Sequence, residues 1–255
     1  MSALLEARNI SKRFGGLEAL IDVSLAINRG EIYGLIGPNG AGKTTFFNAM
    51  TGFYRADRGE FRFDGAQLPV NAPHRVAAAG IARTFQNVRL FGNMSALENV
   101  MVGRHVRTHA GVMGAMLRTA GTRSEERAIH VRAGELLDYV GLTAHQNALA
   151  HSLSYGDQRR LEIARALATE PRLLALDEPA AGMNATETAT LRRLLERIRA
   201  DGTTILLIEH DVKLVMGLCD RVAVLDYGRK IAEGGPAEVR SNPAVIEAYL
   251  GGVLA

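Results

Sequence analysis

The sequence predicts an α/β protein in which a parallel sheet forms the core, an antiparallel β subdomain precedes it and an α-helical subdomain is inserted into it. Three observations predict this class. Residues 4–27 alternate apolar and polar side chains, which favours antiparallel strands with one polar face. Short apolar runs alternate with helical segments in residues 173–225, as in a parallel α/β sheet. Residues 91–150 carry helix signals and almost no strand signal.

The composition is that of an ordinary globular protein, with 47% hydrophobic and 22% charged residues among 255. It excludes disordered, collagen-like and disulfide-scaffold proteins. Thirty Lys and Arg residues face 27 Asp and Glu residues, which lacks the large basic field of a dedicated nucleic-acid binder, so no nucleic-acid partner is expected. The single cysteine, Cys219, fits a reducing compartment. Without a signal peptide or an uncharged apolar run of about 18 residues, the chain is not expected to cross a membrane by itself.

Local patterns predict the elements of the core. The period-two positions of residues 4–27 predict short strands, and the apolar run Ile32–Ile36 predicts a buried one. A helix is expected over Thr44–Met50, after a glycine-rich turn. Three further apolar runs predict buried parallel strands, and a segment with helical spacing lies between two of them. These are the strands Leu173–Leu176, Thr204–Ile208 and Val222–Leu225 and the helix Thr186–Arg199.

The spacing of apolar residues in the middle of the chain predicts helices. Apolar side chains recur at helical spacing in Ser95–His105. Thr122 and Glu125 are spaced as a capping box, a reciprocal side-chain cap that begins a helix, before a second periodic segment. Gly121 and Gly141 are expected to be hinge or cap points.

A phosphate-binding loop is the strongest functional motif. Residues 37–44 match G-x-x-x-x-G-K-[ST] in full, between a predicted strand and a predicted helix. Glycines let successive N–H groups turn toward phosphate oxygens, and the helix N-terminus adds partial positive charge. Lys43 would bind the β- and γ-phosphates, and the Thr44 hydroxyl would bind Mg²⁺. The nucleotide-binding residues expected here are Gly37, Pro38, Asn39, Gly40, Ala41, Gly42, Lys43, Thr44 and Thr45.

A pair of acids ends a predicted buried strand. Asp177 and Glu178 follow Leu173–Leu176, and Pro179 stops the strand. The carboxyl edge of such a sheet is where ligands bind. Asp177 would hold Mg²⁺, and Glu178 would point to the opposite side and orient the attacking water. The alternative, two acids that only solubilise a strand end, loses weight beside a complete phosphate loop.

Three more segments carry residues that suit this chemistry. Leu153–Gln158 opens a helix before the acid pair, Gln86 lies at the beginning of the helical segment, and His210 follows a buried strand. Taken alone, these would be a helix cap, a solvated glutamine and a packing histidine. With the two motifs above, in this order and at these spacings, they resemble the ATP-binding-cassette (ABC) ATPases over essentially the whole chain, from Leu4 to about Gly252.

The resemblance implies a P-loop NTPase (RecA-like) fold and a single ABC ATPase domain over residues 1–255. Residues 1–90 and 155–255 would form the α/β core with its N-terminal antiparallel strands. The helical subdomain would comprise about residues 91–154.

The resemblance also implies a role for each matched residue. Ser154 and Gly156 would be the signature, which in the family binds the γ-phosphate held by the other subunit of a head-to-tail dimer. Gln86 would touch Mg²⁺ or the lytic water and sense the transmembrane partner. His210 would contact the γ-phosphate and help to hold Glu178.

Phe14 stands where the family stacks an aromatic ring on adenine, although a core role for this ring stays open. The cofactors implied are ATP and Mg²⁺. The implied catalytic residues are Glu178, His210, Gln86 and Lys43, and the implied metal ligands are Thr44, Gln86 and Asp177.

Three positions depart from the broad family pattern. Tyr155 replaces the second glycine of the signature, and Asp157 replaces a glutamine. Asp157 would place an acid near the partner's phosphates and weaken capture of ATP. Asn184 replaces an aspartate and would soften communication between the subunits. None of the three is expected to abolish activity.

Shorter stretches resemble the larger ATPase subunit of bacterial branched-chain amino acid importers, among them Lys12–Gly16, Pro179–Gly182, Ala96–Val100 and the segment Asn242–Gly251. The resemblance implies two permease subunits, a second ABC ATPase subunit in a heterodimer or a homodimer, and an external substrate-binding protein. The chain would lie peripherally on the cytoplasmic face of the inner membrane. The alternatives are an importer for urea or another small amide, a non-transport ABC ATPase and a P-loop kinase, which leaves the signature unexplained.

Overall fold

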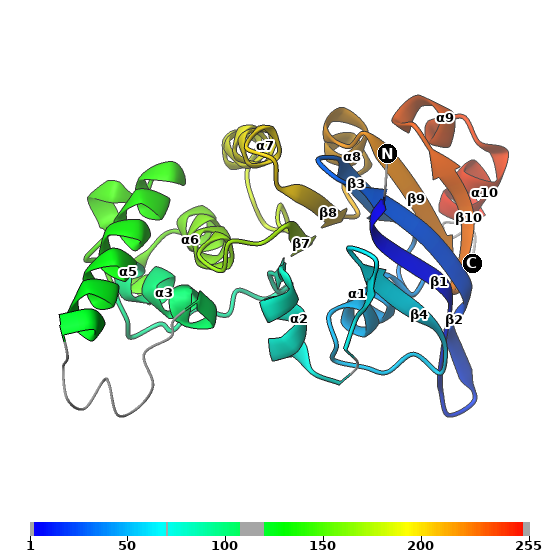
Figure 1. The fold of residues 1–255 in the computed structure, drawn as a ribbon. Coiled ribbons are helices and arrows are strands. Elements are labelled where there is room, and N and C mark those ends of the chain that lie inside the picture. Colours follow the sequence, from blue (N-terminus) through cyan, green and yellow to red (C-terminus); the bar gives the residue numbers. More distant parts are fainter. Residues whose placement is uncertain (1–2, 70, 108–119, 252–255) are drawn as a thin grey trace.

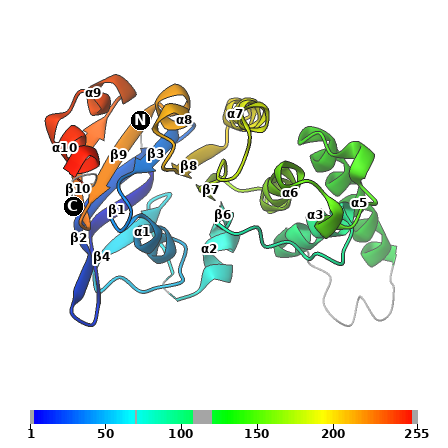
Figure 2. The same cartoon turned by 180° about the vertical axis from the view of Figure 1, so that it is seen from behind.

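The computed structural model describes residues 3–69, 71–107 and 120–251, and it confirms the predicted fold class. A six-stranded sheet and a four-stranded sheet lie together at one end of the molecule, and α3, α5 and α6 gather at the other end (Figure 1). The view from behind shows the same separation (Figure 2). In the residues described, no helix combines the length and apolarity needed to cross a bilayer.

The six-stranded sheet has the order β10-β9-β3-β8-β7-β6 and is parallel except at β10, an antiparallel edge strand. The predicted parallel strands are confirmed, while β6 and β10 were not predicted. The strands are β3 (Ile32–Ile36), β6 (Ile81–Arg83), β7 (Leu173–Asp177), β8 (Thr204–Ile208), β9 (Arg221–Asp226) and β10 (Arg229–Gly234).

The four-stranded sheet is antiparallel with the order β2-β1-β4-β5, so the antiparallel pairing predicted at the N-terminus is confirmed. β4 and β5 were not predicted. The strands are β1 (Ala3–Phe14), β2 (Leu17–Asn28), β4 (Arg58–Phe63) and β5 (Ala66–Gln67).

The helices connect the strands and form the second end of the molecule. Short 3₁₀ turns, η1 (Arg104–Arg107), η2 (Thr143–His145) and η3 (Ala150–Ser152), lie among the helices of that end. The α-helices are α1 (Lys43–Met50), α2 (Pro73–Ala79), α3 (Ala96–Gly103), α5 (Ala120–Tyr139), α6 (Tyr155–Leu167), α7 (Ala185–Ala200), α8 (Val212–Leu218), α9 (Pro236–Arg240) and α10 (Pro243–Gly251).

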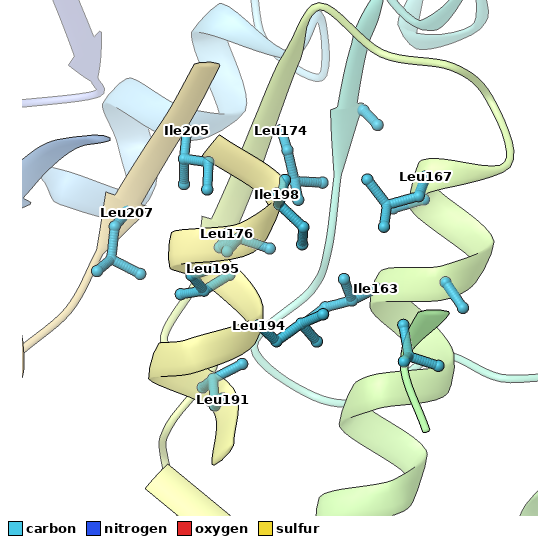
Figure 3. Close-up of a cluster of buried hydrophobic side chains, with 14 of the residues drawn as sticks. Ile163, Leu167, Leu174, Leu176, Leu191, Leu194, Leu195, Ile198, Ile205 and Leu207 are labelled. Atoms are coloured by element: carbon cyan, nitrogen blue, oxygen red, sulfur yellow. The ribbon is translucent and has the colours of Figure 1, made fainter. Parts of the chain in front are cut away.

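The six-stranded sheet is buried on both faces, which is why its strands read as continuous apolar runs. On one face, Leu174 and Leu176 of β7 belong to a core shared with α6 and α7 (Figure 3). On the other face, Ala175 of β7 shares a core with Phe46 and Phe47 of α1 and with the antiparallel sheet. Alternate residues of one strand therefore face different cores.

The helical end corrects two predictions. The predicted capping box at Thr122 and Glu125 is wrong, because both residues lie inside α5, and Gly121 is likewise inside that helix. A capping box does exist at α3, where the Ser95 side chain accepts from the Glu98 N–H and Glu98 accepts from the Ser95 N–H. Gly141 fits its predicted role, since it follows α5 with a φ of +73°.

Candidate nucleotide-binding site

The phosphate loop connects β3 to α1 and is held by close approaches of backbone. A Cβ atom on Gly37 would lie 2.1 Å from the carbonyl oxygen of Leu225, and one on Gly42 would lie 2.5 Å from that of Ala19. Both glycines also have positive φ, +151° and +101°. Only glycine fits such a combination of space and conformation, so these residues fix the loop against the neighbouring chain segments.

α1 begins at the end of this loop without a side-chain cap. Its first bond within the helix runs from the Phe46 N–H to the Gly42 carbonyl at 2.9 Å. The backbone N–H groups of residues 43–45 precede that bond, and helix geometry gives them no carbonyl partner inside the helix. The helix end therefore presents donors and partial positive charge to an anion.

Lys43 is buried at the centre of the loop, with 7% of its surface exposed. Its ammonium donates to the carbonyl oxygens of Gly37 at 2.6 Å and Pro38 at 2.9 Å. Burial lowers the pKa of Lys43, and the carboxylates of Glu178 and Asp177 oppose that shift. A single cation is thus held between the loop and the two acids predicted to lie near it.

A cavity of about 460 Å³ lies in front of the loop. It brings together ten of the predicted site residues from four separate parts of the chain, which is the arrangement that the family resemblance implied. Its lining residues are Phe14, Leu17, Glu18, Ala19, Asn39, Gly40, Ala41, Gly42, Lys43, Thr44, Thr45, Gln86, Glu178, Tyr227 and Gly228.

Strand alternation sets the direction of Asp177. It ends β7 two residues after Ala175, so it faces the same side of the sheet as the core that contains α1. Burial raises the pKa of Asp177 to about 6; the Arg83 guanidinium opposes the rise, and Glu178 adds to it. A buried carboxylate with a raised pKa is a group that a bound cation would stabilise.

Glu178 lies beyond the end of β7, so alternation does not set its direction. Its φ of +47° is in the left-handed region, an uncommon conformation for a residue with a side chain. Gln86 donates from Nε2 to Glu178 Oε2 at 3.0 Å. His210 Nδ1 lies 3.7 Å from the same oxygen. Three of the four predicted catalytic side chains, those of Gln86, Glu178 and His210, therefore meet, although they lie far apart in the sequence.

Phe14 lies at the end of β1, and its ring contacts the edge of Tyr54 with centroids 5.5 Å apart. The alternative core role is wrong, because 43% of Phe14 is exposed. The ring lines the cavity together with Leu17 and Tyr227, which are 68% and 85% exposed. Phe14 and Leu17, which pair across β1 and β2, give the cavity an apolar part.

The signature residues lie elsewhere and do not line the cavity of the phosphate loop. Ser154 is the N-cap of α6, and its hydroxyl accepts from the Asp157 N–H at 3.2 Å. Gly156 packs against α7, where a Cβ would lie 2.7 Å from Glu187 Oε1. The side chain of Asp157 pairs with Arg160 of the same helix, so its acid is balanced locally.

Asn184, the third departure from the family pattern, caps α7. Its side chain accepts from the Glu187 N–H at 3.0 Å, and Glu187 Oε2 accepts from the Asn184 N–H at 2.9 Å. This reciprocal pair completes a capping box. Asn184 therefore has a local structural role as the N-cap of α7.

Sequence reasoning missed several buried charged residues around the site. Glu209, which is 0% exposed, accepts from the Ala180 N–H at 2.9 Å and so ties the end of β8 to the segment after the acid pair. Further charged residues lie near Gln86. The guanidinium of Arg83 lies 4.5 to 4.6 Å from three phenylalanine rings, and burial lowers the pKa of Arg83 to about 10. Arg159 and Glu162, both 2% exposed, join α6 to the backbone around Gln86. The sequence feature that could have revealed Arg159 and Glu162 is the presence of two charges on the otherwise apolar buried face of α6.

The donor set at the cavity fits Mg²⁺ bound together with a nucleotide. Thr44 and Gln86 line the cavity and offer a hydroxyl and an amide oxygen. The buried carboxylate of Asp177 lies close enough to Lys43 to act on the Lys43 pKa. Mg²⁺ prefers oxygen ligands and is commonly held by one or two protein groups plus phosphates. Among the described residues there is no cluster of three or more His, Cys, Asp or Glu that could hold a metal ion without such help.

The fold and the loop define a nucleotide-binding protein of the P-loop class. Residues 20–181 match the family model for ABC transporters, and residues 229–255 match a model described as branched-chain amino acid ATP-binding cassette transporter. The chain therefore belongs to the ABC transporter family, as one of its ATPases, and the resemblance seen in the motifs is confirmed.

Three individual proteins are similar to this chain over nearly its whole length. The high-affinity branched-chain amino acid transport ATP-binding protein BraF of Pseudomonas aeruginosa is 45% identical over 249 residues, which cover 97% of this chain and 98% of that one. LivG of Escherichia coli, which carries the same description, is 47% identical with the same coverage. The crystal structure of the ADP conformation of the cassette MJ1267 superimposes with a TM-score of 0.86, at 32% identity, over 98% of this chain and all of that one.

Proposed function

We propose that the chain is the ATP-hydrolysing subunit of an importer for branched-chain (hydrophobic) amino acids. The observation that carries the proposal is the convergence, in one cavity, of the phosphate loop with the hydrogen-bonded side chains of Gln86 and Glu178. Support for the solute class comes from the match of residues 229–255 and from two relatives at 45% and 47% identity over nearly the whole chain.

The nucleotide would lie along the cavity with its base at the apolar part, against Phe14, and its phosphates at Lys43. Thr44 and Asp177 would hold Mg²⁺, with Gln86 beside them. The bound ion would neutralise charge on the β- and γ-phosphate oxygens. The N–H groups at the start of α1 would bind the same phosphates.

Glu178 would orient the attacking water and accept its proton. Gln86 and His210 both approach Oε2 of this carboxylate, at 3.0 and 3.7 Å. Those contacts leave Oε1 as the acceptor for water and fix the direction in which it points. A carboxylate held in this way is a positioned general base, which contributes about 10²–10⁴-fold to a rate.

Ser154 and Gly156 would act on a nucleotide held by a second ABC ATPase subunit, which is either a different chain or a second copy. Ser154 is exposed at the N-terminus of α6, a 13-residue helix whose partial positive charge suits an anion. Because this helix end is separate from the cavity of its own chain, its phosphate would come from a partner. Binding of two ATP molecules would close the head-to-tail dimer, and hydrolysis would reopen it.

A cavity of about 360 Å³ between α2, β6, α3 and α6 would receive one of two permease subunits. Its rim exposes large apolar side chains, and Gln86 directly follows Phe85 in its wall. A permease segment bound there would bring the chain to the cytoplasmic face of the inner membrane, where an external substrate-binding protein supplies the solute. The exposed apolar rim residues are Phe53, Phe91, Val102 and Val106.

Uptake of radiolabelled solute in cells that lack this gene tests the proposal. Leucine, isoleucine and valine uptake is expected to fall and to return with the wild-type gene, but not with Lys43→Ala. Urea uptake is measured in parallel, because an importer for urea or another small amide is the second candidate. Loss of urea uptake with normal leucine uptake would overturn the proposed solute class.

A further inference from the structure

A buried arginine of α6 binds the backbone carbonyls of two successive residues, Phe85 and Gln86. Arg159 is 2% exposed and is among the largest fully buried side chains. Its Nη1 donates to the Phe85 carbonyl at 2.7 Å, and its Nη2 donates to the Gln86 carbonyl. The helix that begins with the signature is therefore bonded directly to the main chain of the residue beside Glu178.

Glu162, one turn further along α6, holds the N–H groups of the same segment. Its Oε1 accepts from the Phe85 N–H at 3.3 Å and from the Arg89 N–H at 3.4 Å, and its Oε2 lies 3.4 Å from Arg159 Nη1. Burial raises the pKa of Glu162, and Arg159 opposes that shift. Buried charges are costly unless they are paired and hydrogen-bonded, so this geometry leaves the segment little freedom.

Tyr155 completes the arrangement. Its hydroxyl oxygen accepts from Arg159 Nε at 3.1 Å and from Nη2 at 2.8 Å. A glycine, the usual family residue at this position, offers no side-chain acceptor to the guanidinium. The Tyr155 ring also packs against the segment after the acid pair, where a Cβ on Gly182 would lie 3.3 Å from the ring. One side chain thus contacts the signature helix, the Gln86 segment through Arg159, and the segment that follows Glu178.

We propose that Tyr155 is a positioning residue for ATP hydrolysis, because it fixes Arg159, which in turn holds the Gln86 backbone so that the Gln86 amide stays on Glu178. The inference rests on the roles proposed above for Gln86 and Glu178. It also gives a physical route by which a nucleotide bound at the signature of α6 would affect the catalytic carboxylate of the same chain. The steps from Tyr155 to Arg159, from Arg159 to the Gln86 backbone and from the Gln86 amide to Glu178 are direct contacts.

The test is a double-mutant cycle on the purified full chain, in which Mg-ATP hydrolysis is measured under single-turnover conditions for the rate constant and at steady state for the KM. Tyr155→Phe removes the hydroxyl and keeps the ring on Gly182. We expect its rate constant to fall about fivefold, the size of one typical net hydrogen bond, with the KM for ATP within about twofold of wild type. In a Gln86→Ala background the same substitution should lower the rate by less than about twofold, because the group through which it acts is gone.

Tyr139→Phe is the matched control. It also removes a tyrosine hydroxyl from the helical end, one that donates to Asp201 Oδ2 at 2.6 Å and has no contact with the Gln86 segment. Its rate constant and KM should equal those of wild type. Arg159→Lys is the second variant, because a lysine keeps the charge beside Glu162 and cannot bind both carbonyls and the hydroxyl together. It should reproduce the loss seen with Tyr155→Phe.

Three results would overturn the inference. Tyr155→Phe with the wild-type rate shows that the hydroxyl does not position the site. An equal loss in the wild-type and Gln86→Ala backgrounds shows an effect that does not pass through Gln86. A wild-type chain that does not hydrolyse ATP overturns the proposed function and this inference together, whereas an active wild type with an equally active Tyr155→Phe variant refutes only the inference.

Discussion

The phosphate loop and the signature end of α6 both present a helix N-terminus, and they are fixed in opposite ways. Main-chain contacts hold the loop: Gly228 N–H donates to the Ala41 carbonyl at 3.1 Å, and Gly37 and Gly42 lie against other carbonyls where a side chain would collide. Side chains hold the signature end, through the charges of Arg159 and its partners. A loop fixed by main-chain contacts takes its shape from its own chain alone. We expect a helix end fixed by charged side chains to change when the second subunit binds.

The largest effect is expected from Glu178→Gln, at the cavity in front of the phosphate loop. The amide keeps the shape of the side chain and cannot take a proton, so kcat should fall by at least about 10²-fold while ATP binding remains. Steady-state hydrolysis and equilibrium binding of a fluorescent ATP analogue measure the two quantities. Wild-type turnover in this variant would remove Glu178 from the proposed role.

The second prediction compares one glycine from each region. Gly42→Ala meets a backbone carbonyl at 2.5 Å and a φ of +101°, so we expect a loss of about 2 kcal/mol or more in unfolding free energy, with loss of ATP binding. Gly156→Ala meets the Glu187 side chain, with Oε1, Cδ and Cγ at 2.7, 3.0 and 3.2 Å. That side chain can shift only by disturbing its capping box with Asn184, so we expect a loss of about 1 kcal/mol. Urea unfolding of both variants checks this. Equal losses would contradict a backbone-fixed loop.

The third prediction concerns the pH dependence of stability, which Asp177, with its pKa of about 6, should affect. A carboxyl whose folded-state pKa is raised destabilises the protein when ionised, so this group should make the nucleotide-free chain about 1 kcal/mol more stable at pH 5 than at pH 7. Asp177→Asn should abolish that difference. Thermal unfolding of both chains at the two pH values isolates the effect. The same pattern in both chains would mean that another group titrates. Affinity for Mg-ATP should fall below pH 6, because the ion needs the ionised carboxylate.

The smallest effect on nucleotide binding is expected from Ser154→Ala on the isolated chain. It removes the N-cap of α6, a loss of about 1 kcal/mol in unfolding free energy, and should leave binding of the chain's own nucleotide unchanged. Chemical denaturation and nucleotide titration of the same preparation measure both. Weakened nucleotide binding in a monomer would show that Ser154 acts within its own chain and would contradict the head-to-tail proposal.

Much of the fold was predictable because it is local. The strand Ile32–Ile36 was predicted with the bounds that β3 has, since a strand buried on both faces reads as an uninterrupted apolar run. The edge strand β10 and the short β5 carry no such run, and both were missed. The capping box was placed at Thr122 and not at Ser95, because both sites match the same short pattern and only the actual start of a helix separates them.

The candidate site shows the same limit. Motif spacing led to Lys43, Gln86 and Glu178, which the fold brings to one cavity. It did not lead to Arg159, because the value of that residue lies in contacts with carbonyls more than 70 positions away. Spacing within a motif is readable in sequence, whereas packing between distant segments is not.

β7 is only five residues long, and successive residues face different cores. Whether Asp177 meets the nucleotide side of the sheet depends on whether an even or an odd number of residues separates it from Leu173. Removal of one residue inside the strand would turn the carboxylate away from the phosphates even if every hydrogen bond of the sheet formed again. The parity of a short strand is thus as much a part of the candidate site as the acid itself.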